Sequence, residues 1–89
     1  MTICYRLYTE DVNYDAINII VGEMFTSYTL IKGMGVWNRV KEKSVIIEII
    51  SDDSDNVLNK IRSLASTIKI VNYQEAVLIT QTAIIKEII

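Results

Sequence analysis

One short segment of the sequence, from residue 32 to residue 41, holds the residues best suited to bind a ligand. It reads KGMGVWNRVK and combines two glycines, one tryptophan and three cations. Glycines let backbone N–H groups approach an anion closely. Arginine and lysine neutralise phosphates, and an indole ring can stack on a base. The segment therefore predicts a site for a small phosphorylated molecule, with a nucleotide as the favoured class.

The same segment has a structural interpretation. A Gly-x-Gly pair alone is weak evidence for a nucleotide site, and the dinucleotide fingerprint needs a strand-to-helix context that this segment lacks. It could instead be a twisted hairpin whose tryptophan packs against a neighbouring subunit. Both interpretations make this segment the connection of a long hairpin.

Arg6 and Glu48 carry charge inside two predicted strands. A buried charge needs a partner, so a cross-strand ion pair is one interpretation. In the other, Arg6 holds an anion, and Glu48 or Glu75 receives a ribose or an amine. The ligand-binding residues predicted from the sequence are Arg6, Lys32, Gly33, Gly35, Trp37, Arg39, Lys41 and Glu48.

Two further polar pairs fall where predicted strands begin. Glu42 with Ser44, and Gln74 with Glu75, would flank the ends of the sheet and could serve a ligand in the same way.

The sequence offers little for nucleophilic catalysis. It has no histidine, so no serine or threonine has the usual activating base. Its single cysteine, Cys4, is typical of a small buried hydrophobic residue. Asp52, Asp53 and Asp55 lack the spacing of a calcium loop and predict a helix-capping turn. We therefore expect a protein that is not an enzyme and holds no metal and no cofactor; a small enzyme would need a perturbed carboxylate, such as Glu42 or Glu48, in a pocket.

Six segments of regular structure would position these residues. Period-two alternation predicts strands over residues 2–9, 27–33, 43–51 and 74–82, and apolar residues at helical spacing predict helices over 14–25 and 57–68. Asn13 can cap the first helix, the Asp52–Asp55 cluster can cap the second, and the tail 83–89 could extend the last strand or add a helical turn. The order β-α-β-β-α-β predicts a single α+β domain over 1–89, a ferredoxin-like sandwich with a four-stranded antiparallel sheet and both helices on one face.

The other face of that sheet would be open. Its predicted members mix polar and apolar side chains: Arg6, Tyr8, Ile46, Glu48, Leu78 and Thr80. Hydrophobic residues make up 51% of a chain of only 89, which is more than a small core can hide. Because a large exposed apolar patch marks an interface, we expect a homo-oligomer that associates through this face or through the last strand.

Charge and hydropathy exclude several classes of partner. Nine basic and eleven acidic residues leave a net charge of −2, so the chain has no global basic footprint for generic nucleic-acid binding. No run of 18 apolar residues predicts a membrane span, and the N-terminus does not resemble a signal peptide. The expected location is the cytoplasm.

The arrangement Tyr5-Arg6-Leu7-Tyr8, then residues 28–37, then Glu42-Lys43-Ser44 looks like small ferredoxin-like proteins of phages and low-GC bacteria. The pattern T-x-x-x-G-x-G-x-W…E-x-S (Thr29, Gly33, Gly35, Trp37, Glu42 and Ser44) also resembles the hairpin of PII-like signalling proteins. The resemblance covers about half the chain. It implies trimers that bind nucleotides between subunits, although the long flexible loop and the basic signature of PII proteins are missing here.

Two functional hypotheses follow. The first is a non-enzymatic, homo-oligomeric binding protein for a small phosphorylated ligand, such as a phage-encoded sponge for a host nucleotide signal. The alternative is a protein–protein interaction module, such as an inhibitor that docks on a host or defence protein through the open sheet face or an edge strand.

Overall fold

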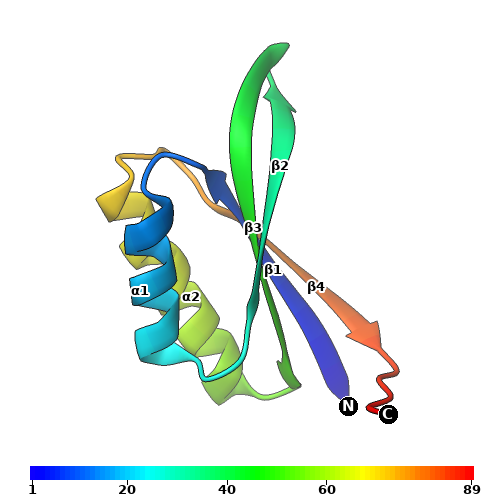
Figure 1. The fold of residues 1–89 in the computed structure, drawn as a ribbon. Helices are drawn as coiled ribbons and strands as arrows, with labels where there is room; N and C mark the ends of the chain where they lie inside the picture. Colours follow the sequence, from blue (N-terminus) through cyan, green and yellow to red (C-terminus); the bar gives the residue numbers. More distant parts are fainter.

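The computed structural model describes residues 1–89 and contains four strands and two helices (Figure 1). In chain order they are β1 (Thr2–Glu10), α1 (Tyr14–Met24), β2 (Thr29–Trp37), β3 (Val40–Asp52), α2 (Asp55–Val71) and β4 (Leu78–Ile84). This order and the antiparallel pairing confirm the predicted ferredoxin-like sandwich.

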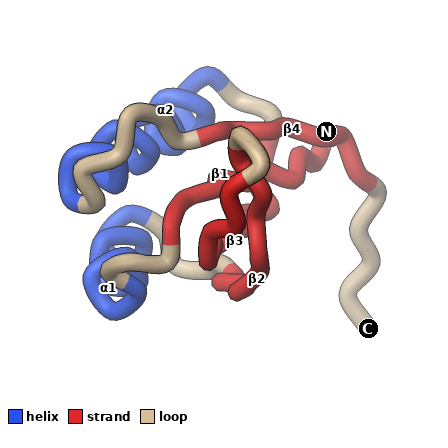
Figure 2. Tube along the Cα trace, turned by 90° about the horizontal axis from the view of Figure 1, so that it is seen from above, coloured by secondary structure: helices blue, strands red, loops and turns tan.

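The sheet has the strand order β2-β3-β1-β4, and both helices lie on one of its faces (Figure 2). Every neighbouring pair of strands is antiparallel. The register sets Arg6 of β1 between Glu48 of β3 and Thr80 of β4. Odd-numbered residues of β1 and β3 point to the helices, and even-numbered ones point to the open face.

The core fills the space between the sheet and the helices. Tyr5 and Leu7 of β1 and Ile47 of β3 are fully buried there. They meet one apolar stripe from each helix, which includes Ile17 of α1 and Leu64 of α2. The buried Tyr5 hydroxyl donates a hydrogen bond to the Asp52 carbonyl at 3.0 Å. Desolvation first, and then the nearby Asp53 and Asp52 charges, raise the pKa of Tyr5.

The hairpin of β2 and β3 is longer than the sequence predicted. Its turn consists of Asn38 and Arg39, which both have positive φ, at 49° and 65°. This pattern is that of a type I′ turn, whose twist matches two strands joined by only two residues. The two strands therefore stay paired up to Trp37 and Val40. As a result, the hairpin projects beyond the end of β1 (Figure 1).

The ends of the helices differ in part from the prediction. The Ser54 hydroxyl accepts a hydrogen bond from the Val57 amide and caps α2, as expected for that cluster. Asn13 stands at the N-cap of α1, but its side chain makes no cap hydrogen bond. Its side-chain amide instead donates at 3.2 Å to Oδ1 of Asn72, the C-cap residue of α2.

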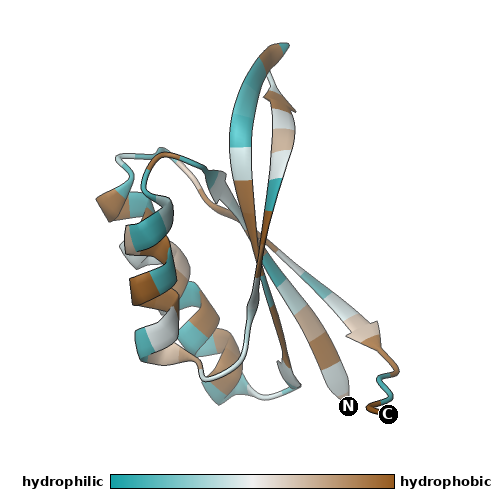
Figure 3. Cartoon of the chain, viewed as in Figure 1, coloured by the Kyte–Doolittle hydropathy of each residue, from teal (hydrophilic) through white to brown (hydrophobic).

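The last strand starts later than predicted, because β1 pairs with β4 only from Leu78 onward. β4 extends to Ile84, and residues 85–89 beyond it form no helical turn. This tail ends in exposed isoleucines, Ile88 and Ile89 (Figure 3). Neither helix combines the length and the apolar character of a membrane span.

Candidate functional site

A cleft of about 630 Å³ lies where the projecting hairpin meets the connection between α2 and β4. Its walls come from four places in the chain: the end of β1, the end of β2, the start of β3 and the segment that follows α2. The lining residues are Tyr8, Thr9, Glu10, Gly35, Val36, Trp37, Glu42, Ser44, Tyr73, Gln74, Glu75, Ala76, Val77 and Leu78. The site depends on the whole fold, because no two elements that follow each other in the sequence supply all of its walls.

The charge of the cleft is entirely negative. Glu10, Glu42 and Glu75 line it, and no lysine or arginine does. Glu10 pairs with Ser44 in the β1–β3 register, so its side chain lies on the same face of the sheet as Glu42. Such a cleft favours a cationic ligand over an anionic one.

The two carboxyl groups of Glu10 and Glu42 are coupled. Desolvation first, and then the charge of Glu42 and a side-chain hydrogen bond with it, raise the pKa of Glu10. Two neighbouring carboxylates resist ionising together, so one of them keeps a proton more readily. The Glu10 carboxyl group therefore holds a proton more readily than an isolated glutamate does.

Aromatic side chains stand on two walls of the cleft. Trp37 at the end of β2 is 70% exposed, and Tyr73 after α2 is 96% exposed. Tyr73 also has φ at 53°, in the left-handed region that is rare for a bulky residue. Both rings are free to stack on a planar base or to cover a cation with a π face.

Gly35 contributes space to the cleft. It pairs with Glu42 across the hairpin, and a Cβ built at Gly35 would lie 2.8 Å from Ser44 Oγ. Any side chain at this position would therefore have to push Ser44 aside. Gly33 differs, because a Cβ there would meet nothing within 4 Å.

A polar network under the cleft ties its walls together. The Asn72 side-chain amide, which is buried, donates to Thr9 Oγ1 at 3.1 Å, to the Glu10 carbonyl at 3.3 Å and to Gln74 Oε1 at 3.2 Å. The Thr9 hydroxyl also donates to Gln74 Oε1. The network fixes the end of β1, and with it Glu10, against the segment that carries Tyr73 and Gln74.

The structure places the residues predicted from the sequence in three groups. Gly35 and Trp37 line the cleft. Gly33, Arg39 and Lys41 belong to the same hairpin but lie outside the lining, Arg39 in the turn itself.

The third group consists of charges that already have partners. On the open face, Arg6 Nη2 lies 2.8 Å from Glu48 Oε2. The side-chain hydrogen bond with Glu48 is the largest of the causes that raise the pKa of Arg6. Lys32 Nζ lies 3.6 Å from Asp11 Oδ2 and 4.3 Å from the centre of the Tyr14 ring. The structure therefore does not bring the predicted cations together into one anion site.

The sequence does not predict a role in the cleft for two of its residues, Glu10 and Tyr73. The sequence pattern predicts a turn at Glu10, whereas in the structure Glu10 ends β1 and pairs with Ser44. Tyr73 directly follows Asn72, the C-cap residue of α2. Glycine is usual at that position, so an aromatic residue there is a sequence signal for a functional role. Two pairs named as secondary candidates, Glu42 with Ser44 and Gln74 with Glu75, do line the cleft. No group of three potential ligands in the chain is arranged to hold a metal ion.

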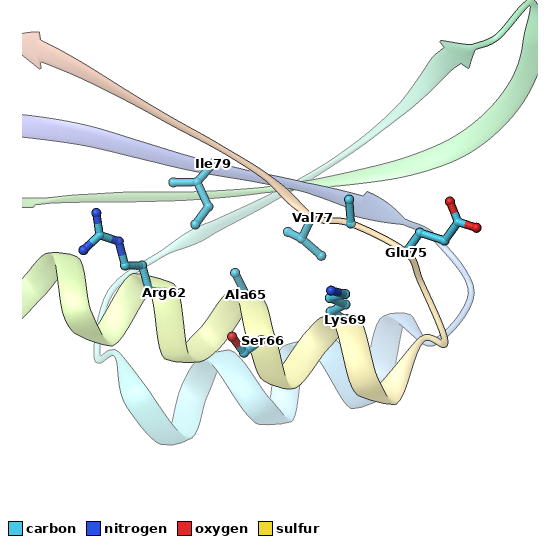
Figure 4. Close-up of a pocket in the computed structure, with 8 residues that line it drawn as sticks. Arg62, Ala65, Ser66, Lys69, Glu75, Val77 and Ile79 are labelled. Atoms are coloured by element: carbon cyan, nitrogen blue, oxygen red, sulfur yellow. The ribbon is translucent and has the colours of Figure 1, made fainter.

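A second, shallower depression of about 300 Å³ lies between α2 and the start of β4 (Figure 4). Arg62, Ser66 and Lys69 of α2 line it, together with apolar residues that include Ala65 and Ile79. Its charge contrasts with that of the cleft, and Glu75, Ala76 and Val77 border both.

The chain shares its fold with several solved proteins. No family model matches the sequence, and no curated protein matches it. A phage SAM lyase in complex with S-methyl-5′-thioadenosine aligns with a TM-score of 0.74 and 16% identity, over 91% of this chain and 80% of that chain. The apo state of a phage SAM lyase aligns with a TM-score of 0.71 and 20% identity, over 90% of this chain and 78% of that chain. The complex of B. subtilis GlnK with ATP aligns with a TM-score of 0.56 and 12% identity, over 91% of this chain and 81% of that chain.

These similarities bear on two predictions from the sequence. The loose PII-like resemblance agrees with the GlnK alignment at the level of the fold. The prediction of a non-enzymatic protein is wrong, because the same fold over most of the chain belongs to a lyase. That prediction was based on the absence of an activated nucleophile, which an elimination reaction does not require.

Proposed function

We propose that this chain is an enzyme that binds S-adenosylmethionine in the cleft and cleaves it to S-methyl-5′-thioadenosine. The observation that carries the proposal is the composition of the cleft: three carboxylates and three aromatic side chains, with no lysine or arginine. The fold shared with the phage SAM lyase supports it.

The ligand and the cleft are chemically matched. S-Adenosylmethionine combines a flat adenine with a positively charged sulfonium. Trp37 and Tyr73 offer exposed rings for the base, and Glu10 and Glu42 offer negative charge for the sulfonium. Aromatic faces also attract a cation, so Tyr8 can contribute to the sulfonium site.

Glu10 and Glu42 take different roles in the proposed reaction. The bond between the sulfonium sulfur and the amino-acid carbon breaks, and its electron pair stays on sulfur as the thioether forms. In the same step the adjacent carbon loses a proton, and the electron pair of that C–H bond forms a carbon–carbon double bond. Glu42 is assigned as the carboxylate that accepts this proton, and Glu10 is the neighbouring carboxyl group, whose pKa is raised by desolvation and then by Glu42.

The proposal includes a homo-oligomer formed through the open face of the sheet. Ile46 and Ile50 share that face with the Arg6–Glu48 pair, and Ile50 is exposed in the single chain. Burying this face between copies would stabilise the assembly at about 25 cal/mol for each Å² of apolar surface. Size-exclusion chromatography with light scattering tests this part, and an Ile50→Glu variant should shift the protein to the monomer. A wild-type monomer at every concentration would contradict it.

A phosphorylated nucleotide is the second candidate ligand. Arg39 and Lys41 at the hairpin turn enter no ion pair within the chain, and the GlnK structure that shares the fold holds ATP. In this alternative the phosphates lie on the hairpin cations and the base lies on Trp37.

Calorimetric titration separates the two ligands. S-Adenosylmethionine, S-methyl-5′-thioadenosine and ATP are titrated into the wild-type protein, and into a Glu42→Gln variant to suppress turnover. The proposal predicts binding of the first two and none of ATP. Binding of ATP alone, weakened by Arg39→Ala, would replace the proposal with the second candidate.

A further inference from the structure

The outer edge of β4 is an open edge of the sheet. β4 pairs with β1 only, so the backbone groups on its other side have no strand partner. Its sequence, LITQTAI, contains no charge, no proline and no glycine. Natural sheet edges are usually protected by charged side chains or proline, and the opposite edge strand, β2, carries Lys32. β4 is therefore a ready template for one more strand.

The depression between α2 and β4 lies beside this edge (Figure 4). Ala65, Val77 and Ile79 form its apolar part, and the cations Arg62 and Lys69 flank it along α2. One carboxylate, Glu75, also lines the depression, so the cations outnumber it. Both cations are exposed, and neither is in an ion pair. They lie two helical turns apart on the same side of α2.

The charge of this surface decides between two kinds of added strand. A second copy that paired its own β4 antiparallel to this one would bring Arg62 and Lys69 of both copies to the same seam, where like charges repel. A strand that carries carboxylates on one side would meet both cations instead. Because alternate residues of a strand share a face, those carboxylates would be two or four positions apart and would all face α2.

We propose that the β4 edge and the adjoining depression bind an extended acidic segment of another protein, which adds to the sheet as a fifth strand. Main-chain hydrogen bonds to β4 would provide affinity. Arg62 and Lys69 would select acidic side chains over basic ones. This site is separate from the cleft and does not depend on the proposed reaction.

A pair of synthetic peptides tests the proposal. One is an eight-residue peptide of alternating valine and glutamate, and the other alternates valine and lysine. The valine–glutamate peptide should bind in a fluorescence anisotropy titration, and the valine–lysine peptide should not. Reversing both charges, with Arg62→Glu and Lys69→Glu, should weaken binding of the acidic peptide by at least about tenfold. Lys60→Glu is the matched control, because Lys60 lies on α2 over the Phe25 ring and away from the depression.

Hydrogen exchange identifies the edge that is used. The acidic peptide should slow amide exchange in residues 78–84 and leave exchange in β2 unchanged. Protection of β2 instead, or equal binding by the charge-reversed variant, would overturn the proposal. Protection of β4 that grows with protein concentration in the absence of peptide would also overturn it, because the occupant would then be a second copy.

Discussion

Desolvation raises the pKa of Glu10, and the charge of Glu42 and a side-chain hydrogen bond with it raise that pKa further. The two residues come from different strands, β1 and β3, and the register that pairs Glu10 with Ser44 brings them to one face of the sheet. This relationship places two carboxyl groups side by side in the cleft, and the proposed chemistry is based on that placement.

The raised pKa of Glu10 predicts a pH dependence of stability. A carboxyl group that binds its proton more tightly in the folded state makes the unfolding free energy fall as pH rises from its unfolded to its folded pKa. The fall begins near the ordinary glutamate value of about 4.3. A Glu10→Gln variant should lack this contribution, so its stability relative to wild type should increase with pH across that window.

Urea unfolding at a series of pH values measures the effect. Only the difference between wild type and variant is informative, because the other carboxyl groups titrate in both proteins. A difference that stays constant, or that changes in the opposite direction, would show that the pKa of Glu10 is not raised in the folded protein.

Tyr73 can be tested for function separately from stability. Its left-handed backbone is strained for tyrosine but not for glycine. Tyr73→Gly relieves that strain and also increases the entropy of the unfolded chain, so the unfolding free energy should change by less than about 1 kcal/mol. Ligand binding should nevertheless weaken by about 1–3 kcal/mol, the usual value of a base stacked on an aromatic ring.

Tyr73→Phe is the control, because it keeps the ring in place. It should bind S-adenosylmethionine as wild type does. If Tyr73→Gly bound the ligand equally well, the exposed ring would have no part in the site.

The two glycines of the hairpin give a matched pair of substitutions. Gly35→Ala places a methyl group 2.8 Å from Ser44 Oγ at the floor of the cleft, whereas Gly33→Ala meets nothing within 4 Å and lies outside the lining. Gly35→Ala should therefore weaken ligand binding by at least about 1 kcal/mol, the lower range for an overpacked position. Gly33→Ala should leave it unchanged.

Calorimetric titration of both variants provides the measurement, and adding Ser44→Ala to Gly35→Ala removes the direct clash. Partial recovery of affinity in the double variant would locate the defect at this contact. Equal affinities for the two single variants would place the ligand elsewhere.

The fold was predictable because its signals are local. Alternation along β1 and β3 correctly separates buried residues such as Leu7 and Ile47 from open-face residues such as Arg6 and Glu48. The interpretation of Arg6 and Glu48 as a cross-strand ion pair also follows from this periodicity. Helical spacing likewise identifies the buried stripe of α2.

The cleft was harder to predict because its geometry depends on long-range register. The hairpin projects because Asn38 and Arg39 form a tight turn, and arginine at the second position is not the usual asparagine–glycine signal. The location of Glu10 beside Glu42 depends on how far β1 pairs with β3, which no local pattern specifies. The cations near Trp37 in the sequence predict a phosphate site, but in the structure Lys32 forms an ion pair with Asp11 instead.

The central claim is that Glu42 acts in the cleavage of S-adenosylmethionine. The most direct test incubates purified wild-type protein and Glu42→Gln with S-adenosylmethionine and measures S-methyl-5′-thioadenosine by liquid chromatography and mass spectrometry. Glu23→Gln, an exposed position on α1, is the matched control. We predict repeated turnover by wild type and Glu23→Gln, and a loss of at least about 100-fold in Glu42→Gln. Absence of product from wild-type protein that is folded and binds S-adenosylmethionine, or undiminished turnover by Glu42→Gln, would contradict the claim.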